Sequence, residues 1–219
     1  MAEQFFEAYR VSETAGNNFE SAIIKRSINE LPQSEILIKV SYSSLNFKDA
    51  LSASGNKGVT RKYPHTPGID AAGIVVSSTS KKLEAGDEVL VTGYDLGMNT
   101  DGGFGQYISV PSDWVVPLPD NLGLKESMML GTAGLTAGLS VKKLVDAGLT
   151  PESGDILVTG ATGGVGVLAV ALLIELGFNV TASTGKSSEV TFLEALGAQV
   201  IDRVELSEAS TRSLLREKW

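Results

Sequence analysis

Residues 158–166 read Val158-Thr159-Gly160-Ala161-Thr162-Gly163-Gly164-Val165-Gly166. This segment lies between an apolar run at 155–159, which has the length of a buried strand, and a run at 164–176, which has the length of a helix. A strand–turn–helix context is typical of a phosphate-binding turn, because small residues let a ligand approach the backbone and the helix N-terminus presents unpaired N–H groups. We therefore predict a dinucleotide pyrophosphate at the main chain of Thr162, Gly163, Gly164, Val165 and Gly166.

The spacing of the glycines matches the G-x-G-x-x-G pattern only in part. Ala161 stands at the position of the first glycine, while Gly163 and Gly166 occupy the second and third positions. The pattern alone is a weak signal, and a tight turn without a ligand is the alternative interpretation. The position between a strand and a helix favours dinucleotide binding.

Strand and helix patterns alternate along the C-terminal part of the chain. A helix is predicted at 124–147, and a βαβαβα order follows it, which predicts a parallel sheet with right-handed crossovers. This is the first half of a doubly wound, or Rossmann, α/β domain. The predicted strands are 155–159, 178–183 and 199–201, and the predicted helices are 164–176, 188–196 and 207–218.

The N-terminal part of the chain has the pattern of a β-rich domain. Short β-branched runs are separated by glycine and proline turns, which is typical of a small barrel. One short helix is predicted at 46–52. We expect two domains, a β-barrel domain at 1–120 and the partial Rossmann domain at 121–219. The predicted strands of the first domain are 20–28, 35–43, 69–77, 88–92, 105–110 and 114–116.

Composition excludes several classes of function. With 18 Lys and Arg against 26 Asp and Glu, the formal charge is −8, which argues against nucleic-acid binding. No cysteine is present, and the single histidine, His65, is assigned to the surface, so no metal site is expected. The charge-free run at 156–174 contains four glycines and is assigned to a buried strand, turn and helix rather than to a membrane span. A cytoplasmic protein is expected.

The end of the second strand of the α/β part indicates which dinucleotide binds. An NAD site usually places an acidic residue there, but Ser183-Thr184-Gly185-Lys186 stands at this place and no acid occurs before Glu189. Hydroxyl and ammonium groups suit a ribose 2′-phosphate. We therefore predict NADPH, held by Ser183, Thr184, Lys186 and, after the third strand, Arg203. The alternative is an ordinary solvated loop with a surface arginine.

Several segments resemble the medium-chain dehydrogenase/reductase superfamily. Together they are specific, and they resemble its zinc-free quinone oxidoreductase branch and, within that branch, the YhdH/YhfP group, which includes acryloyl-CoA reductases. The similar segments lie in the same order along nearly the whole chain. They are Ser43-Ser44-Leu45-Asn46-Phe47-Lys48-Asp49-Ala50-Leu51, Pro67-Gly68-Ile69-Asp70-Ala71-Ala72-Gly73, Gly86-Asp87-Glu88-Val89, Gly131-Thr132-Ala133-Gly134-Leu135-Thr136-Ala137, the glycine turn and Ala182-Ser183-Thr184-Gly185-Lys186.

This resemblance implies a GroES-like β-barrel domain followed by a Rossmann domain, with NADPH in the cleft between them. It implies hydride transfer to a quinone or to an α,β-unsaturated carbonyl such as an enone or enoyl-CoA, in a homodimer. Zinc-dependent relatives carry cysteine and histidine ligands in the regions 46–49 and 68–70, and this chain has neither there, so zinc-independent chemistry is expected. Family members continue beyond the half-sheet seen here, so a C-terminally truncated form is expected, and a non-catalytic nucleotide-binding or interaction module is the alternative.

The resemblance also points to candidate catalytic and binding residues. The amide of Asn46 is a candidate for holding the nicotinamide ribose or the substrate oxygen, and capping of the short helix is its alternative role. Lys48 is a candidate donor to the enolate or to a CoA phosphate, or else a solvated lysine. Asp49 is expected to be a structural partner of Lys48, Arg61 or Lys62. Thr132 and Thr136 are expected to meet the cofactor, or else to pack against the sheet.

Overall fold

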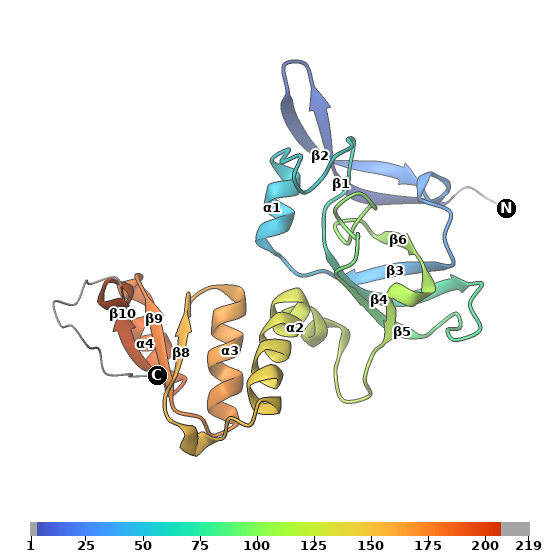
Figure 1. Ribbon diagram of the computed structural model, residues 1–219. Coiled ribbons are helices and arrows are strands. Elements are labelled where there is room, and N and C mark those ends of the chain that lie inside the picture. Colours follow the sequence, from blue (N-terminus) through green and yellow to red (C-terminus); the bar gives the residue numbers. More distant parts are fainter. Residues whose placement is uncertain (1–3, 207–219) are drawn as a thin grey trace. The chain divides into compact units, whose positions relative to one another are not determined.

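The computed structural model describes residues 4–206, so the helix predicted for 207–218 lies outside the described residues. The chain forms two compact units, Met1–Thr132 and Ala133–Trp219 (Figure 1). The division falls inside helix α2 (Leu124–Asp146), which was predicted as one continuous helix. The backbone of α2 leaves helical geometry at Gly131, with φ 50° and ψ −151°. Glycine is suited to this position because it adopts such a conformation without steric cost.

The first unit contains a five-stranded antiparallel sheet with the strand order β6-β3-β4-β5-β7. Alternation of apolar residues places Ile36 and Ile38 of one strand, with Val89 and Val91 of another, in a common core. The predicted β-rich N-terminal part is therefore confirmed. The strands are β3 (Ile36–Tyr42), β4 (Asp70–Ser78), β5 (Glu88–Thr92), β6 (Tyr107–Val110) and β7 (Val115–Pro117).

An antiparallel hairpin precedes this sheet. Strands β1 (Phe5–Thr14) and β2 (Asn18–Ser27) pair along their whole length, as the blue ribbon of Figure 1 shows. Strand β2 was predicted from the sequence, but β1 was not. Its apolar residues do not alternate strictly, since Phe5 and Phe6 are adjacent and only Phe6 is buried.

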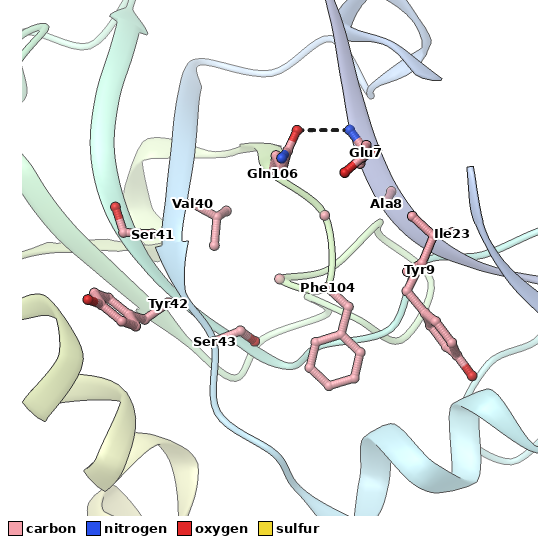
Figure 2. A pocket seen from close by; sticks show the side chains of 12 residues that line it. Glu7, Ala8, Tyr9, Ile23, Val40, Ser41, Tyr42, Ser43, Phe104 and Gln106 are labelled. Atoms are coloured by element: carbon pink, nitrogen blue, oxygen red, sulfur yellow. Dashed lines mark hydrogen bonds between the residues drawn. The ribbon is translucent and has the colours of Figure 1, made fainter. Parts of the chain in front are cut away.

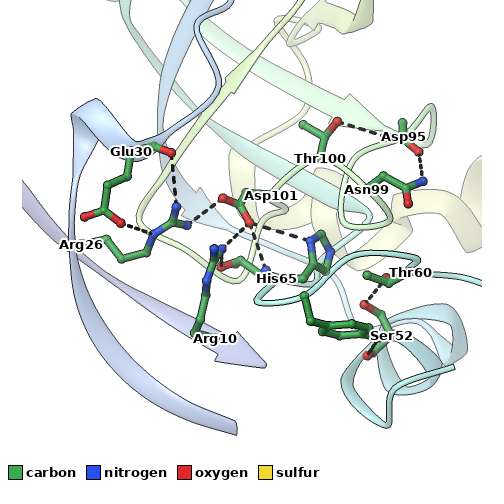
Figure 3. Close-up of polar contacts among 12 residues, drawn as sticks. Arg10, Arg26, Glu30, Ser52, Thr60, His65, Asp95, Asn99, Thr100 and Asp101 are labelled. Carbon is green, nitrogen blue, oxygen red and sulfur yellow. Dashed lines mark hydrogen bonds and ion pairs between the residues drawn. The ribbon is translucent and has the colours of Figure 1, made fainter. Parts of the chain in front are cut away.

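A network of buried charges joins the hairpin to the loops of the first unit. Asp101 accepts a hydrogen bond from Arg10 at 2.6 Å and another from Arg26 at 2.7 Å (Figure 3). The backbone N–H of Thr66 also donates to Asp101. His65 lies beside this carboxylate and is 3% exposed, so its assignment to the surface is wrong. Burial lowers the pKa of His65, and a neutral imidazole adds no charge to the network.

The second unit contains the predicted parallel sheet, with the strand order β10-β9-β8. Helix α3 (Gly164–Glu175) packs against β8 and β9, and α4 (Val190–Ala195) packs against β10. Short side chains and aliphatic residues from these elements form a second core. The α/β alternation predicted from the sequence is therefore confirmed as far as the third strand, and the last predicted helix lies outside the described residues. The strands are β8 (Ile156–Thr159), β9 (Val180–Thr184) and β10 (Gln199–Asp202).

The remaining elements are short and lie between these strands and helices. Helix α1 (Phe47–Ala53) follows β3, as predicted. Within residues 4–206, none of the helices combines the length and the apolar character needed to cross a lipid bilayer. Single 3-10 turns occur at Ile28–Glu30, Ser112–Trp114, Pro151–Ser153, Ser187–Glu189 and Arg203–Leu206.

Candidate functional site

The glycine turn connects β8 to α3 in the predicted strand–turn–helix arrangement. Gly160 has a positive φ of 61°, and the N–H of Gly163 donates to its carbonyl oxygen at 2.9 Å, which closes the turn. Gly163 then caps α3, and Gly163, Gly164 and Val165 are exposed. The first-turn N–H groups of a helix have no acceptor within the helix, so this exposed end can bind an anion.

Gly166 allows the helix to lie close to the turn. A Cβ atom at this position would stand 2.2 Å from the carbonyl oxygen of Gly160 and 2.9 Å from the Cα of Ala161. Both of these atoms belong to the backbone, so neither can turn aside. Ala161 is fully buried, and its N–H donates to the carbonyl of Ser183 on β9, which anchors the turn to the sheet.

The structure places the loop after β9 next to the glycine turn. The hydroxyl groups of Thr162 and Thr184 lie 3.5 Å apart, and the N–H of Lys186 donates to the hydroxyl of Thr184 at 3.1 Å. The side chain of Arg203 lies across Gly185, where a Cβ atom would be 2.5 Å from its Nε. Four of the residues predicted to bind the cofactor are therefore brought together in one unit.

The two cations of this group remain available to an anionic ligand. Lys186 and Arg203 are exposed, and neither forms an ion pair with any other residue between 4 and 206. Ser183 differs from them, because it is only 2% exposed and its carbonyl is already bonded to Ala161. The cluster therefore offers its two cations more readily than the side chains of Ser183 and Thr184, since Thr184 is also buried and its hydroxyl already accepts from the N–H of Lys186.

A second polar cluster lies in the first unit, around the buried carboxylate of Asp70. Its Oδ2 accepts from Ser44 Oγ, from Asn46 Nδ2 at 2.9 Å and from the N–H of Thr132 at 2.9 Å. Its Oδ1 accepts from Thr132 Oγ1 at 2.7 Å. Two of the predicted site residues, Asn46 and Thr132, are thus held by a carboxylate to which the sequence analysis gave no role.

The neighbouring Asp49 has a structural role different from the expected one. Its oxygens accept from the backbone N–H of Asn46 at 2.7 Å and from that of Ile69 at 2.9 Å. Among the residues that the structure describes it forms no ion pair, so the expected pairing with Lys48, Arg61 or Lys62 is wrong. Burial raises the pKa of Asp49 and the charge of Asp70 adds to this, while the two backbone hydrogen bonds oppose it.

The remaining predicted residues lie in α1 or α2, or next to α1. Lys48 lies in the first turn of α1 with an exposed side chain. Asn46 is the residue that caps α1, as its alternative role predicted, although its side-chain amide is directed to Ser44 and Asp70. Thr136 belongs to the second unit, where its carbonyl accepts from Ser140.

A shallow pocket of about 290 Å³ opens in the first unit, beside the cluster around Asp70 (Figure 2). Tyr9, Tyr42 and Phe104 contribute aromatic rings, and Ser43 and Gln106 contribute polar groups, which is a lining typical of small-molecule sites. Ser43 connects the pocket to the cluster, because its hydroxyl donates to the backbone carbonyl of Asp70 at 2.7 Å.

Known proteins are similar to this chain in its N-terminal part and in its C-terminal part. The alcohol dehydrogenase GroES-like domain family matches residues 32–120. YhfP of Bacillus subtilis (strain 168), named as a quinone oxidoreductase, is 50% identical over 194 residues, which cover 88% of this chain and 59% of YhfP. AcuI of Ruegeria pomeroyi, named as an acrylyl-CoA reductase, is 44% identical over 201 residues, which cover 91% of this chain and 61% of AcuI. The chain belongs to the medium-chain dehydrogenase/reductase superfamily.

Solved structures of this medium-chain dehydrogenase/reductase group have the same fold. The YhdH oxidoreductase of Salmonella enterica, solved in complex with NADP, has a TM-score of 0.92 and 40% identity, and the match covers 97% of this chain and 65% of YhdH. YhfP of Bacillus subtilis, solved with NAD bound, has a TM-score of 0.94 and 46% identity, covering 99% of this chain and 66% of YhfP. The predicted combination of a GroES-like domain and part of a Rossmann domain is confirmed. The chain spans about three fifths of the length of the two curated relatives.

Sequence reasoning about this medium-chain dehydrogenase/reductase missed Ser44 and Asp70. Both lie inside segments quoted for the family resemblance, but neither was given a role. The available signal was Asp70 itself, an acidic residue directly before Ala71 and Ala72 at the start of a predicted buried strand. A buried carboxylate requires several donors, and that requirement identifies Asp70 as a centre of contacts.

Proposed function

We propose that this chain carries the cofactor-binding part of an NADPH-dependent oxidoreductase that transfers hydride to a quinone or to an α,β-unsaturated carbonyl compound of the acryloyl-CoA type. The observation that carries the proposal is that the first-turn N–H groups of α3, which have no acceptor within the helix, lie in the same unit as Thr184, Lys186 and Arg203. The helix end suits the pyrophosphate, and the two cations suit the ribose 2′-phosphate. The relatives carry the names of a quinone oxidoreductase and an acrylyl-CoA reductase, and YhdH was solved in complex with NADP.

The cations make NADPH a better ligand than NADH in this proposal. YhfP was solved with NAD and YhdH with NADP, so similarity alone leaves both cofactors open. At the end of β9 this chain carries Ser183, Thr184 and Lys186 in place of an acid that would bind a ribose hydroxyl. We therefore assign the 2′-phosphate to Lys186, Arg203 and Thr184, with Ser183 beside them.

The chemistry needs few proton-transfer groups. A reduced nicotinamide, with its dinucleotide held at the N-terminus of α3 and by Lys186 and Arg203, would supply a hydride to the β-carbon of the acceptor, and the electron pair of the double bond would move onto the carbonyl oxygen. That oxygen needs a hydrogen-bond donor or a cation, and the α-carbon then takes a proton from water. The exposed ammonium of Lys48 is the proposed donor. No step requires zinc, and within residues 4–206 no cluster of three or more His, Cys, Asp or Glu side chains could hold a metal ion.

Replacing Lys186 with alanine tests the cofactor assignment. We expect the Kd for NADPH to rise about tenfold, because a charge-assisted contact to phosphate is worth roughly 1.5–3 kcal/mol when buried and less when exposed. The Kd for NADH, which has no 2′-phosphate, should change less than twofold. Fluorescence titration of the two reduced cofactors measures both constants. Equal changes for the two cofactors would contradict the assignment.

Turnover tests the reaction class and separates it from the alternative of a nucleotide-binding module without catalysis. The protein is mixed with NADPH and either acryloyl-CoA or benzoquinone, and the absorbance of the reduced nicotinamide is followed. We expect NADPH oxidation that depends on the acceptor. Binding of NADPH without oxidation by either acceptor would favour the non-catalytic module. Light scattering of the same sample measures whether the chain forms the homodimer, which stays a prediction.

A further inference from the structure

Asp70 is a buried carboxylate that no cation neutralises. It is 0% exposed, and within the described part of the chain it forms no ion pair. Four hydrogen bonds from Ser44, Asn46 and Thr132 stabilise it instead. Gly131 leaves room for these contacts, because a Cβ atom there would stand 2.7 Å from Asp70 Oδ2 and 2.9 Å from Ser44 Oγ.

This carboxylate determines which end of the Asn46 amide faces inward. An ionised carboxylate only accepts hydrogen bonds, so it requires the NH₂ group. The two protons of Asn46 Nδ2 are directed to Asp70 Oδ2 and to Ser44 Oγ, each at 2.9 Å. If the amide turned over, its carbonyl oxygen would face the carboxylate with no proton between them. For a further partner Asn46 therefore offers only its carbonyl oxygen, an acceptor that also faces the backbone N–H of Asp49 in the capping box of α1.

The hydroxyl of Ser44 is fixed by the same carboxylate. Its single hydroxyl proton is donated to Asp70, and its oxygen accepts from Asn46. Only a lone pair remains for another group. Ser44 and Asn46 thus offer hydrogen-bond acceptors and no donors.

We infer that Asp70 is a positioning residue, which holds Asn46 so that the carbonyl oxygen of its amide receives a hydroxyl group of the nicotinamide ribose. This inference rests on the proposed function. The sequence left two roles open for Asn46, binding of the ribose or of the substrate oxygen. A ribose hydroxyl is a donor and fits an acceptor, whereas a developing enolate oxygen needs a donor and would be repelled. The enolate therefore depends on a group other than Asn46, for which Lys48 is proposed above.

The first arm of the test replaces Asn46 with alanine and measures two ligands. NADPH contains the nicotinamide ribose, and adenosine 2′,5′-bisphosphate lacks it. We expect the Kd for NADPH to rise about tenfold, the loss of one hydrogen bond with its acceptor, while the Kd for the bisphosphate changes less than twofold. The kcat for acryloyl-CoA is measured at saturating NADPH, and we expect the loss of NADPH affinity to exceed any loss of kcat. A large fall in kcat with an unchanged Kd for NADPH would overturn the inference, because it would make Asn46 the enolate donor.

The second arm tests Asp70 through Asn46. Asp70→Ala frees the amide to turn and should raise the Kd for NADPH about as much as Asn46→Ala, and the double variant should be no weaker than either single variant. Asp70→Asn keeps one side-chain oxygen that can accept hydrogen bonds from Asn46 and Thr132. Its Kd for NADPH should therefore stay within about threefold of that of the unmodified chain. Additive effects in the double variant would contradict the positioning role. If Asp70→Ala does not fold, the first arm and Asp70→Asn still decide the question.

A matched control is Asp101→Asn, which changes a half-buried carboxylate of the same unit that has no hydrogen bond to Ser44, Asn46 or Thr132. We expect it to lower the melting temperature and leave the ratio of the two dissociation constants unchanged. If the unmodified protein binds neither ligand, the proposed function fails together with the inference. If it binds both and the Asn46 and Asp70 variants bind NADPH normally, only the inference fails.

Discussion

Replacing Gly166 with alanine is expected to abolish NADPH binding and to destabilise the second unit. The added Cβ would stand 2.2 Å from the carbonyl oxygen of Gly160, closer than any relaxed contact between these atoms. Either α3 moves away from β8 or the turn changes its conformation, and both displace the N–H groups proposed to bind the pyrophosphate. Overpacking of this kind costs about 1–3 kcal/mol. Fluorescence titration with NADPH should show an affinity loss of about a hundredfold or more.

Gly138 provides the control for this prediction. It lies in α2, and no atom stands within 4 Å of the position of its Cβ. Gly138→Ala should therefore bind NADPH normally and gain up to about 1 kcal/mol in stability, because alanine favours a helix over glycine. Thermal unfolding of both variants measures the contrast. Normal NADPH binding by Gly166→Ala would show that the close packing of α3 on the turn is not needed for the cofactor.

Replacing Asp101 with alanine should have the largest effect on stability, about 3–5 kcal/mol. Arg26 is 3% exposed, and its guanidinium would be left buried without its strongest partner. Arg10 would lose the same carboxylate. Urea denaturation followed by tryptophan fluorescence measures the free energy of unfolding, since Trp114 packs against the core of this unit. The matched control is Asp146→Ala, whose partner Lys142 is exposed, and which should cost about 0.5 kcal/mol or less.

The contribution of Asp101 should also depend on pH. Burial by itself would raise the pKa of Asp101, but the hydrogen bond from Arg26 and the charges of Arg10 and Arg26 outweigh burial and hold the pKa below its ordinary value of 3.8. A lowered pKa in the folded state means that the stabilisation is present above the ordinary value and is lost as the pH falls through the lowered one. The difference in stability between the unmodified chain and Asp101→Asn should therefore shrink below about pH 4. A difference that stays constant down to pH 2 would contradict this.

Much of the fold could be predicted because its signals are local. The apolar run before Gly160, the glycines after it and the alternation of strand and helix predicted the parallel sheet. The cofactor cluster was predicted for the same reason, since Thr162 follows one strand and Thr184 and Lys186 follow the next. Parallel neighbouring strands end at the same edge of a sheet, which brings these residues together. The roles of Ser183, Thr184, Lys186 and Arg203 in binding stay predictions.

Other features depend on residues far apart in the sequence. Asp70 is 24 residues from Asn46 and 62 from Thr132, so no spacing rule connects them. His65 was assigned to the surface because no partner could be identified near it, yet it is buried beside Asp101. Strand β1 was missed because its adjacent phenylalanines hide the period of two that a half-buried strand shows.

The main-chain turn between β8 and α3 can be read from a few consecutive residues, because a positive φ and a close helix contact each require glycine at a defined position. The orientation of the Asn46 amide cannot be read in this way. It depends on a carboxylate that the fold buries beside it, and a buried acceptor must be met by donors wherever in the chain they arise. Tertiary structure therefore decides which atom of Asn46 remains for a ligand.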